Sequence, residues 1–140
     1  MENLAPEGEV ANMVVPKAGA GPYTIPEGTT ETTIYVRYKN NEAQFASTEA
    51  GPYCHGPIAW SYDSQQQDPP PLKITFMYVG DVWKLKHASA NLELGPWQQG
   101  DTQQTCEVAA VAAPASNPDK FWVVTKNGDT HDPKIVVTPQ

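Results

Sequence analysis

Apolar and polar side chains alternate along several short stretches of the chain, which is the pattern of β-strands with one buried face. In residues 32–38, for example, Ile34, Val36 and Tyr38 share one face, and mostly polar residues share the other. Further strands are predicted over residues 43–46, 58–62, 72–79, 82–86, 104–112, 121–125 and 134–138. No stretch repeats apolar residues with a helical period, so the pattern predicts an all-β protein.

Two of these predicted strands lie on either side of the dipeptide Gly80-Asp81. Glycine at the first position of a two-residue loop suits a type II′ turn, which joins neighbouring antiparallel strands. Such a hairpin would place Phe76 opposite Leu85 and would give the pair one wholly apolar face. We therefore predict that these two strands pair with each other.

A second turn signal, Asn127-Gly128, precedes the last predicted strand. A tight turn there would put Pro133 inside the returning strand, where proline removes a backbone donor. We therefore expect a longer loop over residues 127–133.

Fourteen prolines and ten glycines agree with many short strands separated by turns. At 140 residues the chain has the size of one domain. We predict a single antiparallel β-sandwich over residues 31–140, jelly-roll or immunoglobulin-like, with about seven to nine short strands. Residues 1–30, rich in proline and glycine, are expected to form an N-terminal arm with one short strand.

The charge of the chain argues against two classes of partner. The formal net charge is −7, and Arg37 is the single arginine. Nucleic acids and anionic membrane surfaces are bound by clusters of basic residues, which this sequence lacks. We therefore expect neither nucleic acid nor membrane as a partner.

The first residues carry acidic side chains where a secretory leader carries basic ones, and no long apolar run follows them. These features predict a cytoplasmic protein, or one exported without an N-terminal signal peptide. Cys54 and Cys106 could form one disulfide, but reduced thiols fit this expectation better.

No sequence motif of a familiar catalytic mechanism is present. Cys54 and His55 are adjacent, so in a strand their side chains would point to opposite faces. Spacings typical of zinc or calcium sites are absent, and the polar loop 127–132 is read as a solvated turn. The sequence predicts a non-enzymatic protein with no metal and no cofactor, and an uncharacterised hydrolase is the second alternative.

Aromatic and amide side chains in predicted loops suggest a ligand site. Sugar recognition needs a flat apolar ring together with amide or carboxylate partners for hydroxyl groups. The candidate ligand-binding residues are Tyr53, His55, Trp97, Gln98, Gln99 and Asp101. Trp97 could equally fold back over the core, and the tryptophans within strands are read as core residues.

Assembly is the other hypothesis, and we place it first. An extended arm with a short strand can add to an exposed sheet edge of another chain. The candidate contacts are Val10, Met13, Val14 and Val15. The sequence thus favours a module for self-assembly or protein binding, with a lectin-like glycan-binding protein as the alternative.

Overall fold

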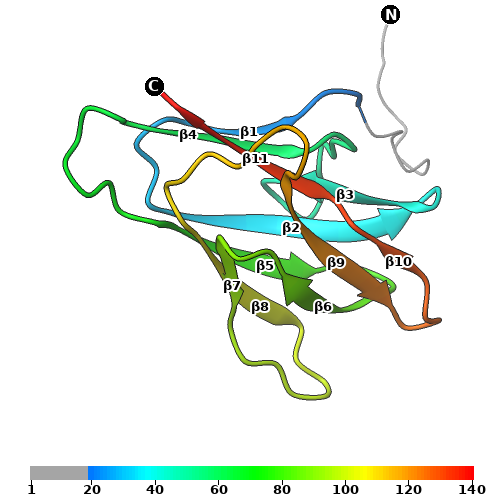
Figure 1. The fold of residues 1–140 in the computed structure, drawn as a ribbon. Coiled ribbons are helices and arrows are strands. Elements are labelled where there is room, and N and C mark those ends of the chain that lie inside the picture. The colour runs from blue at the N-terminus through cyan, green and yellow to red at the C-terminus, as the bar shows by residue number, and fades with distance from the viewer. Residues whose placement is uncertain (1–18) are drawn as a thin grey trace, which may run out of the picture.

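The computed structural model describes residues 19–140, which form eleven strands and no helix (Figure 1). The strands are β1 (Tyr23–Ile25), β2 (Glu31–Lys39), β3 (Glu42–Ala46), β4 (Ile58–Tyr62), β5 (Leu72–Tyr78), β6 (Val82–Ala88), β7 (Leu92–Leu94), β8 (Gln103–Val108), β9 (Asp119–Thr125), β10 (Thr130–His131) and β11 (Lys134–Pro139). The prediction of an all-β protein is confirmed. The strands outnumber the prediction, since β1, β7 and β10 are only two or three residues long.

The strands form two sheets. The first has the order β1-β4-β11-β9-β10, with β6 also paired to β9, and the second has the order β3-β2-β5-β8-β7. Figure 1 shows β1, β4 and β11 running together, apart from the layer that contains β2 and β5. None of residues 19–140 belongs to a helix that could span a lipid bilayer.

The expectation of a purely antiparallel fold is wrong. β4 pairs in parallel with both β1 and β11, and β2 pairs in parallel with β5. The chain passes between the sheets at most of its connections, so strands that are consecutive in sequence seldom pair. Because no hairpin fixes their direction, neighbours that are distant in sequence can run parallel.

The predicted hairpin at Gly80-Asp81 is also wrong, although a turn does form there. The amide of Val82 donates to the carbonyl of Val79, yet β6 pairs with β9 in the other sheet. β5 has no free edge for β6, because β2 occupies one side and β8 the other. The turn therefore carries the chain from one sheet to the other, so β5 and β6 are not side by side.

The turn at Asn127-Gly128 is tighter than expected. The amide of Gly128 donates to the carbonyl of Thr125, and β10 returns antiparallel to β9. β10 ends at His131, so Pro133 lies outside both β10 and β11 and breaks no pairing. A proline between two short strands is compatible with the ladder.

The core lies between the sheets and centres on three phenylalanines. The rings of Phe45, Phe76 and Phe121 are fully buried, and the centroids of Phe76 and Phe121 are 5.2 Å apart. Phe45 lies 6.4 Å from Phe76 and 6.3 Å from Phe121. Since β9 supplies Phe121 and the other sheet supplies its two partners, this cluster joins the layers.

We predict that Phe121→Ala lowers the free energy of unfolding by about 3–5 kcal/mol, because it removes a buried ring and leaves a cavity. Urea unfolding followed by circular dichroism measures the change. Lys120→Ala, one residue away on the exposed face, should cost no more than about 1 kcal/mol. Equal losses for the two variants would contradict a core centred on Phe121.

Candidate functional site

A pair of tryptophans stands where β6 and the loop after β7 come together. The rings of Trp83 and Trp97 meet edge to face, with centroids 5.3 Å apart and an interplanar angle of 89°. The ammonium of Lys84 lies 4.4 Å from the centroid of Trp83 and 5.2 Å from that of Trp97. Aromatic packing and a cation over the rings hold both side chains in place.

A β-bulge aims Trp83 away from the core. The pairing of β6 with β9 shifts register between Val82 and Lys84, so Trp83 is an extra residue in its strand. Val82 and Leu85 are buried although they are three positions apart, and Trp83 is only half-buried. Bulges commonly redirect a side chain in this way. The alternation alone had assigned Trp83 to the core.

Gly95 explains how the chain brings Trp97 to this place. The amide of Gly95 donates to the carbonyl of Thr105, and a Cβ on residue 95 would collide with the Thr105 hydroxyl. A side chain at residue 95 would force the Thr105 hydroxyl to move, and Pro96 then restricts the backbone before Trp97.

The loop that follows Trp97 forms a turn closed by hydrogen bonds between Gln98 and Asp101. The carboxylate of Asp101 accepts a hydrogen bond of 2.8 Å from the amide of Gln98, and the amide of Asp101 donates to the carbonyl of Gln98. Gly100 has a φ of +98°, a conformation that favours glycine. These contacts fix the backbone conformation of the turn and so position the side chains that it carries.

A buried polar network underlies the turn. The hydroxyl of Tyr78 donates to Oε1 of Gln104 at 2.6 Å, and the amide of Leu85 donates to the same oxygen at 3.1 Å and to the Tyr78 hydroxyl at 3.2 Å. Nε2 of Gln104 donates to the carbonyl of Gly95. The network therefore connects β5 and β8 of one sheet to β6 of the other.

Burial raises the pKa of Tyr78 well above its usual range, and the nearby carboxylate of Asp101 raises the pKa further. The amide of Leu85 acts in the opposite direction. The phenol therefore stays protonated at all physiological pH values and remains a hydrogen-bond donor.

These groups surround a hollow with a volume of about 370 Å³, within the range of small-ligand pockets. Its lining comprises Tyr78, Gly80, Val82, Trp83, Gln99, Gly100, Asp101, Thr102 and Lys126. Two of the predicted ligand residues, Gln99 and Asp101, are among them. The hollow thus combines an indole, a phenol, an amide, a hydroxyl, a carboxylate and an ammonium group.

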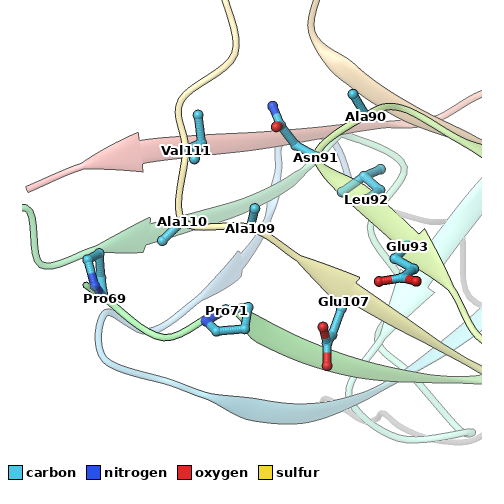
Figure 2. A pocket seen from close by; sticks show the side chains of 10 residues that line it. All are labelled: Pro69, Pro71, Ala90, Asn91, Leu92, Glu93, Glu107, Ala109, Ala110 and Val111. Carbon is cyan, nitrogen blue, oxygen red and sulfur yellow. The ribbon is translucent and has the colours of Figure 1, made fainter.

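A second hollow, of about 440 Å³, lies between the loop before β5 and the segment after β8 (Figure 2). Alanines and prolines form much of its lining, and Glu93 and Glu107 are directly opposite each other on β7 and β8. It has no aromatic side chain, and its charged groups are two carboxylates of like sign. None of the predicted ligand residues lines it.

Tyr53 and His55 lie elsewhere, beyond β3 at the opposite edge of the second sheet from the loop of Trp97. The Tyr53 ring is buried under the guanidinium of Arg37, 3.9 Å from its centroid, and the hydroxyl donates to the carbonyl of Glu49. Burial raises the pKa of Tyr53. Both its ring face and its hydroxyl are engaged within the chain, so Tyr53 fits a packing role.

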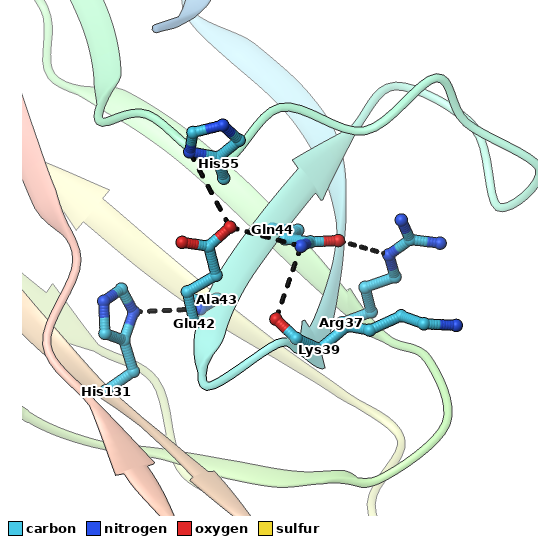
Figure 3. Close-up of polar contacts among 7 residues, drawn as sticks. All are labelled: Arg37, Lys39, Glu42, Ala43, Gln44, His55 and His131. Atoms are coloured by element: carbon cyan, nitrogen blue, oxygen red, sulfur yellow. Dashed lines mark hydrogen bonds and ion pairs between the residues drawn. The ribbon is translucent and has the colours of Figure 1, made fainter. Parts of the chain in front are cut away.

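His55 belongs to a polar cluster around the start of β3 (Figure 3). Its Nδ1 lies 3.7 Å from a carboxylate oxygen of Glu42, and the buried Gln44 accepts a 2.7 Å hydrogen bond from Nε of Arg37. In the same view, Nδ1 of His131 accepts a hydrogen bond from the amide of Ala43. These contacts tie β10 and the segment around His55 to the β3 edge.

The cysteines of the described part of the chain form no disulfide, and its possible metal ligands form no cluster. Cys54 and Cys106 are both free, and burial raises the pKa of the Cys106 thiol to about 12, which keeps it protonated. Across residues 19–140, no three His, Cys, Asp or Glu side chains gather closely enough to hold a metal ion.

The predicted assembly contacts Val10, Met13, Val14 and Val15 lie outside the described residues. The description begins at Gly19, whose amide donates to the carbonyl of Tyr53 and whose carbonyl accepts from the amide of His55. β1 follows in the expected arm and joins the first sheet through Ile25, which is buried.

Comparisons of the chain with protein-family models, with curated proteins and with solved structures find no match.

We predict that Tyr78→Phe lowers the free energy of unfolding by about 1–2 kcal/mol, because it leaves buried partners with one hydrogen bond fewer. Chemical denaturation measures the loss. Tyr62→Phe is the matched control, since the Tyr62 hydroxyl makes no hydrogen bond within the part of the chain described. A stability unchanged by Tyr78→Phe would contradict the structural role of the network.

Proposed function

We propose that this protein is a β-sandwich module that binds glycans in the hollow beside Trp83. The observation that carries the proposal is that Trp83 lines this hollow together with polar residues of several kinds, namely Gln99, Asp101, Thr102 and Lys126. An aromatic surface takes the C–H face of a sugar ring, while the polar groups can exchange hydrogen bonds with its hydroxyls.

The proposal assigns different roles to the loop residues. Trp83, Gln99 and Asp101 would contact the sugar, since these residues line the hollow. Trp97 and Gln98 would act as positioning residues, because Trp97 packs against Trp83 and the Gln98 amide is bound by Asp101. Tyr53 and His55 are not part of this proposal.

A glycan array followed by calorimetry with the best-binding sugar tests the proposal. Trp83→Ala should weaken binding by about tenfold or more, since burying an aromatic ring is worth on the order of 1.5–3 kcal/mol. Trp122→Ala is the control, because Trp122 is a partly exposed tryptophan on β9 and does not line the hollow. An array without any bound glycan, or equal effects of the two variants, would refute glycan binding here.

Assembly through the N-terminal arm is a second candidate, and the position of β1 favours it. β1 lies at the end of the first sheet and pairs only with β4 among the strands of residues 19–140. An edge strand with unpaired backbone groups can accept a strand from another chain.

Deletion of residues 1–16 should shift the sedimentation profile toward the monomer if the arm carries the contacts. Circular dichroism of the truncated chain checks that the β-structure is retained. An unchanged sedimentation profile would count against assembly through the arm.

A further inference from the structure

Another hollow adjoins the hollow beside Trp83 along the turn that borders it. A neighbouring hollow of about 460 Å³ is lined by Pro96, Gly100, Asp101, Thr102, Gln103, Gln104 and Thr105. The two hollows share Gly100, Asp101 and Thr102, so they lie on either side of one short segment. Together the two adjoining hollows, called the path, offer more lining residues than either hollow alone.

Gly100 belongs to the segment that the two hollows share. A Cβ placed on this residue would meet no atom within 4 Å, so the space beside its Cα is open. Glycine adds no side chain that would stand between the two hollows. The hydrogen bonds within residues 98–101 hold this part of the turn in position.

The two hollows also have a common base. Tyr78 lines the hollow beside Trp83, and Gln104 lines the neighbouring hollow. The 2.6 Å hydrogen bond between these two residues connects the two linings. The carbonyl of Thr102 accepts from the amide of Tyr78, which fixes the shared segment to β5. The path is therefore supported by buried, hydrogen-bonded groups.

The lining of the whole path mixes apolar and polar groups, and its charged side chains are balanced. Lys126 and Asp101 are its only charged side chains, and amides and hydroxyls from Gln99, Gln103, Thr102 and Thr105 supply most of the remaining hydrogen-bonding groups. A chain of anionic sugars would meet one cation, one anion and a protein of net charge −7.

From the shared segment, the common base and this charge balance, we propose that the site binds an internal stretch of a neutral, linear glycan, with sugar units on both sides of Gly100. This inference rests on the proposed glycan-binding function. It extends that function from a single sugar ring at Trp83 to a chain that also contacts Gln103 and Thr105.

Calorimetry on the full chain tests the inference with the best-binding neutral sugar of the array and its linear oligomers of one to six units. Affinity should rise by about tenfold or more between the shortest and the longest oligomer. Gln103→Ala should reduce this gain from chain length, because Gln103 is exposed and lines only the neighbouring hollow, not the hollow beside Trp83. Lys134→Ala is the control. Because Lys134 lines neither hollow, this variant should leave the gain in affinity unchanged.

The outcomes separate this inference from the function on which it rests. Binding of the short sugar, lost in Trp83→Ala but with no gain from added units, would overturn the extended path and leave the glycan-binding function standing. Preference for anionic oligomers such as polyuronates would overturn the neutral class. Absence of binding by every oligomer would refute both proposals.

Discussion

The contact on which the candidate site depends is the buried hydrogen-bond network of Tyr78, Gln104 and Leu85. β6 belongs to the other sheet from β5, where it pairs with β9. Without a partner from the sheet of β5, the backbone amide of Leu85 would remain unpaired. The phenol of Tyr78 and the amide of Gln104 take the place of a neighbouring strand and satisfy this donor. Because Tyr78 lines one of the two adjoining hollows and Gln104 lines the other, the residues that secure the crossing also contribute to the site.

Local patterning predicted the strands well and their partners poorly. The predicted strands over residues 32–38 and 43–46 do form, as β2 and β3, and they pair across a short turn at Asn40 and Asn41. The alternation in β5 and β6 requires only that each strand have one buried face. Two strands meet this requirement equally well side by side in one sheet or facing each other across a core, so the pattern could not exclude the crossing at Gly80.

The candidate site was also predicted only in part, because some of its features depend on nearby residues and others on which strands pair. Gln99 and Asp101 were found because loop amides and carboxylates can be recognised from sequence, and both line the hollow. Trp83 was missed because a bulge, which depends on pairing with β9, breaks the period-two pattern at that residue. Tyr53 had the right residue type for a sugar site, but its ring is covered by Arg37 from β2, a contact that no local pattern reveals.

The place of β11 has a consequence for the order in which the molecule can form. β11 follows the other strands of residues 19–140 in sequence, yet it lies inside the first sheet, between β4 and β9. During synthesis, β1 and β4 emerge early but lack the strand that links them to the rest of their sheet. Since such distant pairings form slowly and domains fold as units, this sheet can close only after residues 134–139 have left the ribosome.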